Sequence, residues 1–263
     1  MQAECEGTSD EKPYKAPGDN NQDYGYSFYP ERYQVKEFEK NSKLGNFIDS
    51  CKQSLLTQDA KLKCERTVSF VVDRSPFIRI MTKAMSALGC DFDPKRHVSC
   101  EKCSKIVAGG YDPSTNQIVM CQENAMDTRF CEGTMAHEMV HMFDLCRNKM
   151  DFSNINHLAC TEIRAYNLTP CLFSGFFWRN PNIAIPVKHT HKQCVRYKAA
   201  ASIAMSRTNI TMDQALEIVD KVFDKCYADL EPLGYIPAIG NYEKAKRLYR
   251  TYENQNPYEL GAV

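Results

Sequence analysis

Two histidines separated by three residues constrain the fold of this chain most. His137 and His141 are four positions apart, and on a helix such residues share one face with their Cβ atoms about 5–6 Å apart. Both imidazoles can then bind one zinc ion, each at about 2.0–2.1 Å. The flanking residues are apolar, and buried imidazoles need polar partners. The flanks are Met135, Ala136, Met139, Val140, Met142 and Phe143. We therefore predict a buried, metal-binding helix over residues 127–148.

Glu138 lies between the two histidines and gives this helix its predicted chemistry. The segment reads H-E-x-x-H, the arrangement of zinc peptidases. In this arrangement the glutamate lies beside the metal and takes a proton from water whose pKa the ion lowers towards about 7. Glu138 is thus the predicted catalytic base, with one Zn²⁺ per chain as cofactor.

A third protein ligand must come from another segment, because a catalytic zinc site has three protein ligands and an open position. Glu162 lies 21 residues after His141, on the next predicted helix, and is the favoured candidate. His157 is the alternative, since zinc sites with three histidines also occur. Asp144 lies one turn past His141, where it either orients a ligand from behind or binds Arg147.

Composition excludes several functions. The 263 residues carry 33 Lys and Arg against 33 Asp and Glu, so no charge excess suggests a nucleic-acid partner. No apolar run approaches the about 18 residues of a membrane span. The first thirty residues have neither the basic flank nor the apolar core of a secretory signal. We therefore expect a soluble protein.

Thirteen cysteines favour an oxidising compartment, a second metal site, or both. Because the number is odd, at least one thiol is unpaired in a monomer, and Cys5 is our candidate. Cys194 and Cys226 lie nearly equidistant from a predicted turn at Asn209-Ile210. Two antiparallel helices joined there would bring them face to face, so we predict a Cys194–Cys226 disulfide.

The chain divides into a central domain with a tail at each end. Residues 1–42 lack a sustained period and are predicted to be disordered or loosely docked, as is the polar C-terminal tail at 241–263. Within 43–240, helices surround a short β-rich stretch, which indicates an α+β fold. Its last strand is predicted to be an edge strand that aligns an extended peptide substrate. That strand contains Gln117, Ile118, Val119 and Met120.

These motifs together resemble the mitochondrial inner-membrane metalloproteases that process and help to assemble an ATP synthase subunit. The similar segments are 117–121, His137-Glu138-Met-Val-His141 with Asp144 and Cys146-Arg147, residues 156–165, and Cys194-Val-Arg196 with Cys226. The similarity spans about residues 51–237. Tyr166 departs from it, because a small residue is expected at that position.

The resemblance implies a zincin-like metallopeptidase domain with a helical N-terminal extension and a C-terminal helical hairpin. It implies a zinc-dependent endopeptidase of the mitochondrial intermembrane space, peripheral on the inner membrane. Its protein substrate would be the precursor of an ATP synthase membrane-sector subunit, whose assembly it would also assist. An alternative is a chaperone or adaptor that keeps the zinc site but acts by binding alone.

Overall fold

The computed structural model describes a mixed α and β architecture, which confirms the α+β prediction. It describes residues 29, 44–104, 107–125, 127–169, 171, 191–234 and 236, with the backbone alone for 44–58. The tails predicted at 1–42 and 241–263 therefore lie outside the described residues apart from Tyr29, and so does Cys5.

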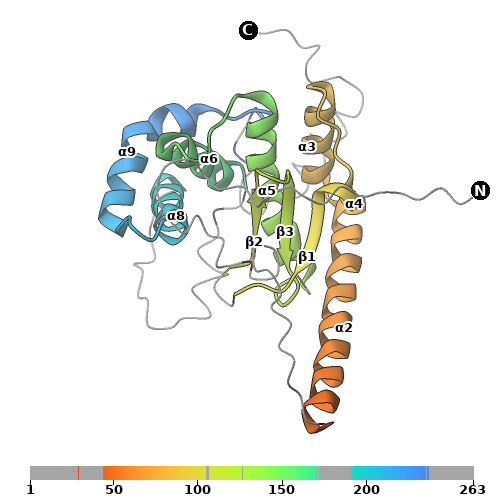
Figure 1. The fold of residues 1–263 in the computed structure, drawn as a ribbon. Coiled ribbons are helices and arrows are strands. Elements are labelled where there is room, and N and C mark those ends of the chain that lie inside the picture. Colours follow the sequence, from red (N-terminus) through yellow and green to blue (C-terminus); the bar gives the residue numbers. More distant parts are fainter. Residues whose placement is uncertain are drawn as a thin grey trace, which may run out of the picture.

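Two helices of more than ten residues precede the sheet in the described part of the chain. Helix α2 (Leu44–Arg74) is long and runs along one side of the molecule, extending beyond the sheet (Figure 1). Helix α3 (Pro76–Ala87) begins as the sequence indicates, with Ser75 accepting a hydrogen bond from the Ile78 N–H and proline in the first turn. It ends before Gly89, whose positive φ of 83° suits a residue without a Cβ.

The sheet has three short strands in the order β1-β3-β2. They are β1 (Val98–Glu101), β2 (Gly109–Asp112) and β3 (Gln117–Cys121), and the short helix α4 (Pro94–His97) precedes them. β1 is parallel and β2 antiparallel to β3. The loop between β2 and β3 is held by Asp112, whose carboxylate accepts hydrogen bonds from Ser114 and Thr115.

Helix α5 (Thr128–Arg147) packs against the sheet and against α3, and it is the element that the sequence predicted over 127–148. The Asp127 side chain caps its first turn by accepting from the Phe130 N–H. Its apolar side chains, including Met135, Met139 and Phe143, form a first hydrophobic core with residues of α2, α3 and the sheet.

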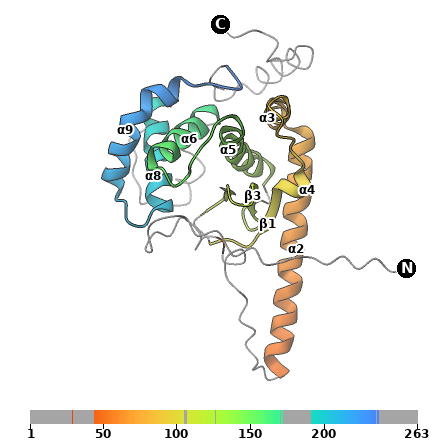
Figure 2. The ribbon, with the colours of Figure 1, turned by 45° about the horizontal axis from the view of Figure 1, so that its top comes forward.

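The other helices form a second core beside the first. Helix α6 (Ile155–Leu168) packs with α8 (His191–Ser206) and α9 (Met212–Ala228) on the side of the sheet away from α2 (Figures 1 and 2). Thr211 and Gln214 form a capping box at the start of α9. α6 contributes side chains to both cores, so it lies at the boundary between them.

Among the residues whose side chains the structure describes, ten cysteines form five disulfides. They are Cys64–Cys100, Cys90–Cys146, Cys103–Cys121, Cys160–Cys226 and Cys171–Cys194. Cys131, which is buried in α5, is the free cysteine of the described part. Both cores contain disulfides, which is consistent with the oxidising compartment that the cysteine content suggested.

The predicted Cys194–Cys226 disulfide is wrong. Cys226 of α9 bonds to Cys160 of α6, with Cα atoms 5.3 Å apart, and Cys194 of α8 bonds to Cys171, with Cα atoms 6.2 Å apart. The prediction treated α8 and α9 as an isolated hairpin. Because α9 packs against α6 as well as α8, Cys226 lies on the α6 side and meets a different cysteine.

A search of the described helices for a span with the length and apolar character needed to cross a bilayer finds none.

Candidate metal centre

Helices α5 and α6 bring three metal-binding side chains to one point. The Nε2 atoms of His137 and His141 lie 3.3 Å apart, as their spacing on α5 dictates. Glu162 approaches from α6, with Oε2 3.6 Å from the His137 Nε2 and Oε1 3.7 Å from the His141 Nε2. Ligand atoms around a tetrahedral zinc ion lie roughly 3.3–3.6 Å from one another. The geometry of the three side chains therefore fits one such ion.

A buried oxygen of Glu162 supports the same conclusion. Its Oε2 is buried and has no hydrogen-bond partner among the described residues. An unsatisfied buried oxygen, here on a carboxylate, is costly, and a cation between the three side chains would satisfy it. Burial also lowers the pKa of His141 to about 4, which keeps its imidazole in the neutral form that binds metals.

His157, the alternative third ligand, lies elsewhere. Its side chain is exposed near the start of α6, where Nδ1 accepts a hydrogen bond from the Asp151 N–H. It does not belong to the cluster of His137, His141 and Glu162. The structure thus brings Glu162 and not His157 to the two histidines.

Thr161 orients His141 from behind. Its hydroxyl donates to Asp144 Oδ2 at 2.8 Å and lies 2.9 Å from the His141 Nδ1. Since the hydroxyl hydrogen is committed to the carboxylate, the threonine oxygen accepts from the Nδ1–H of His141. The lone pair of His141 is then on Nε2, which faces His137 and Glu162. Such outer contacts fix both the tautomer and the direction of a metal-binding histidine.

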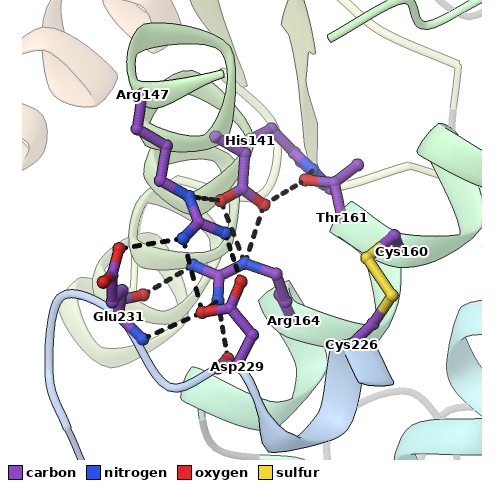
Figure 3. Close-up of polar contacts among 9 residues, drawn as sticks. His141, Arg147, Cys160, Thr161, Arg164, Cys226, Asp229 and Glu231 are labelled. Atoms are coloured by element: carbon purple, nitrogen blue, oxygen red, sulfur yellow. Dashed lines mark hydrogen bonds and ion pairs between the residues drawn. A yellow bond between two sulfur atoms is a disulfide. The ribbon is translucent and has the colours of Figure 1, made fainter. Parts of the chain in front are cut away.

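Asp144 joins this arrangement to a larger network of ion pairs, of which Figure 3 labels Arg147, Arg164, Asp229 and Glu231. Its carboxylate accepts from Arg164 of α6 at 2.9 and 3.0 Å, and from Arg147 at 3.1 Å. Both arginines also bind the segment after α9, through Asp229 and Glu231. Asp144 is therefore in contact with Arg147 and, through Thr161, with His141, the two roles considered from the sequence.

Glu138 lies between the helix and strand β2. Its side chain is buried, and the backbone N–H of Tyr111 donates a hydrogen bond to the carboxylate. Burial raises the pKa of the Glu138 carboxyl to about 7. A carboxyl group with a pKa near neutrality can both accept and release a proton under ordinary conditions.

β3 is the central strand of the sheet, so the prediction that it is an edge strand is wrong. Ile118, Val119 and Met120 are paired with β1 on one side and β2 on the other, and Gln117 is paired with β2, so the strand has no free edge along which a peptide could pair. The sequence predicts the bounds of β3 correctly, but its neighbours depend on contacts between distant segments.

The outer edge of β2 borders Glu138 instead. The Cys121 N–H bonds to the Ala108 carbonyl, and in an antiparallel ladder such pairs alternate with pairs that do not bond to each other. The backbone N–H and C=O groups of Gly109 and Tyr111 therefore point away from β3. The Tyr111 N–H is the group that reaches Glu138.

The side chain of Tyr166 lies beside His137, and Lys198 lies over the Tyr166 ring. The ring centroid of Tyr166 is 4.4 Å from that of His137, and the Lys198 Nζ is 5.6 Å from the Tyr166 centroid. Sequence reasoning noted Tyr166 solely as a departure from the family pattern. Its position one turn after Glu162 on α6 was the available signal, because residues four apart share a face. No pattern in the sequence around Thr161 or Lys198 indicated that these residues lie near the candidate metal centre.

Comparisons with known proteins show the family of this chain. A family model described as Peptidase M76 family matches residues 62–234, a range that contains all of the clustered side chains. The chain belongs to the Peptidase M76 family. This membership confirms the resemblance inferred from the sequence motifs, and it makes the chain a member of a peptidase family.

Curated relatives of this family member are mitochondrial proteases. The mitochondrial inner membrane protease ATP23 homolog of Danio rerio is 38% identical over 251 residues, which are 95% of this chain and 92% of the relative. The human homolog of the same name is 38% identical over 198 residues, 74% of this chain and 78% of the relative. The mitochondrial inner membrane protease atp23 of Schizosaccharomyces pombe is 35% identical over 170 residues, 64% and 90% of the two chains. No solved structure matches this chain significantly.

Proposed function

We propose that this chain is a zinc-dependent endopeptidase with a zincin-like site, in which His137, His141 and Glu162 bind the metal. The observation that carries the proposal is the convergence of these three side chains, all with ligand atoms within 4.8 Å of one another, beside the buried Glu138. The matching peptidase family supports it. Zinc, when bound, supplies a Lewis acid that polarises a carbonyl and lowers the pKa of water to about 7.

Glu138 is the proposed general base and acid. Its carboxylate accepts the proton of the attacking water and then passes it to the departing amine nitrogen. The Tyr111 N–H donates a hydrogen bond that fixes the position of this carboxylate. Burial keeps the pKa of the carboxyl group near neutrality, which suits both proton transfers. The outer edge of β2 is the proposed site where an extended peptide pairs with the chain.

The proposed substrate is the precursor of an ATP synthase membrane-sector subunit, whose assembly the chain would also assist. The proposed location is the mitochondrial intermembrane space, with peripheral attachment to the inner membrane. The relatives from Danio rerio and Schizosaccharomyces pombe are named as mitochondrial inner membrane proteases, which supports this location. The five disulfides support an oxidising compartment for this chain.

Elemental analysis of the purified protein tests the metal site. Wild type and His157→Ala should each hold one equivalent of zinc, whereas Glu162→Ala should lose it because two histidines on one helix leave the site incomplete. Glu138→Gln should hold zinc and cleave no peptide. Well-folded wild type that takes up no zinc from metal-replete buffer would overturn the proposal. Full assembly function in Glu138→Gln would instead favour the binding-only alternative.

A further inference from the structure

Tyr29 lies on the outer edge of β2, beside the candidate active site. Its hydroxyl donates a hydrogen bond of 2.7 Å to the Gly109 carbonyl, from 80 residues away in the sequence. This carbonyl is one of the groups that point away from β3. Tyr29 thus contacts the same strand edge that borders Glu138 through Tyr111.

One of the two glycines of β2 leaves space for this tyrosine. A Cβ on Gly110 would overlap the Tyr29 hydroxyl and lie 2.9 Å from its Cζ, so the ring rests where any other residue would place its side chain. A Cβ on Gly109 would point to the opposite face and lie 2.8 Å from Thr134 Cγ2 of α5. Because Gly110 has no side chain, the Tyr29 ring can occupy the space beside it, while Gly109 allows β2 to lie close to α5.

Tyr29 occupies part of the same edge of β2 that is proposed to bind the peptide substrate. A peptide that pairs along β2 needs the outward N–H and C=O of Gly109 and the C=O of Tyr111, because β3 leaves these groups unused and the Tyr111 N–H is bound to Glu138. Tyr29 occupies the Gly109 carbonyl, and its ring covers the neighbouring Gly110. An extended peptide and Tyr29 cannot use this end of the edge at the same time.

We propose that Tyr29 is a self-inhibitory contact, which must leave Gly109 and Gly110 before an extended peptide pairs along the full length of β2. The inference rests on the proposed function, because it concerns the strand edge assigned there to the substrate. The contact, or gate, should weaken peptide binding only modestly, because one hydrogen bond shifts an equilibrium by about 2- to 10-fold.

Peptide binding to the full chain tests the gate. The background is Glu138→Gln, which prevents cleavage, and the probe is a pool of fluorescein-labelled decapeptides followed by anisotropy. Tyr29→Ala should lower the Kd by about 2- to 10-fold, and Tyr29→Phe, which keeps the ring, by less. Tyr197→Ala, which removes an exposed tyrosine of α8, should leave the Kd unchanged. An equal or higher Kd in Tyr29→Ala overturns the gate.

Hydrogen exchange of residues 107–112 separates failure of the gate from failure of the proposed function. Tyr29→Ala should speed exchange there without peptide, and bound peptide should slow it. If wild type and Tyr29→Ala bind peptide equally, the peptide site stands and the gate alone is overturned. If neither variant binds peptide while exchange still responds to Tyr29→Ala, the β2 edge is no peptide site, and both proposals about that edge fall.

Discussion

The Thr161 hydroxyl links His141 to a buried carboxylate, with its oxygen 2.9 Å from the histidine Nδ1. The carboxylate belongs to Asp144, which Arg164 and Arg147 hold in place. The direction of one candidate metal ligand is therefore set by a network that extends to the segment after α9. The predictions below test this network, the disulfides and the free thiol.

Replacing Thr161 should weaken zinc binding while leaving all three ligands in place. Thr161→Val keeps the shape of the side chain but removes the oxygen that accepts from His141, so we expect zinc affinity to fall about 10- to 100-fold. Competition with a chromophoric chelator measures the affinity. Thr161→Ser retains the hydroxyl and is the matched control. Wild-type affinity in Thr161→Val would show that the hydroxyl does not orient the ligand.

Arg164→Met should destabilise the fold strongly. The side chain of Arg164 is 1% exposed and pairs with Asp144, which would keep a buried charge with less compensation. Breaking such a buried pair costs about 3–5 kcal/mol, measured as the free energy of unfolding in urea. The control is Arg196→Met, whose pair with Asp220 is 41% and 48% exposed and should be worth less than about 1 kcal/mol. Equal losses in both variants would contradict the assignment.

Peptide mapping without reduction should find Cys226 joined to Cys160 and Cys194 joined to Cys171. Because Cys160–Cys226 closes a loop of 66 residues, its removal should cost about 4 kcal/mol of unfolding free energy in the chain-entropy model. Cys160→Ser, Cys226→Ser and the double variant should lose similar amounts, since each breaks the same bond. A fragment that joins Cys194 to Cys226 would restore the original sequence prediction.

Cys131 should resist alkylation in the native protein. Burial raises the pKa of its thiol to about 12, so about one molecule in 10,000 carries the reactive thiolate at pH 8. We expect iodoacetamide to leave Cys131 unmodified in native protein and to label it fully in guanidinium chloride, with mass spectrometry locating the site. Fast labelling of the native protein would mean that α5 opens far more readily than its packing indicates.

Local signals predicted much of this fold. The segment predicted as a strand coincides with β3, and the helix predicted over 127–148 differs from α5 by one residue at each end. The H-E-x-x-H spacing depends on a single helix, so the sequence alone brings its two histidines together.

Features that join distant segments were not predictable in the same way. The position of β3 within the sheet depends on which strands flank it, and the partner of Cys226 depends on where α6 lies. Likewise, no periodic pattern connects Tyr29 to Gly109 or Thr161 to His141, because each contact is created by the packing of separate elements.

The boundary between the two cores runs through the metal centre. His137 and His141 lie on α5, whose apolar side chains belong to the first core, while Glu162 lies on α6 among residues of the second. Coordination bonds tolerate displacements of about 0.2 Å, far less than hydrophobic contacts do. Metal release would therefore report a slight displacement of α6 against α5 even while both cores stay folded.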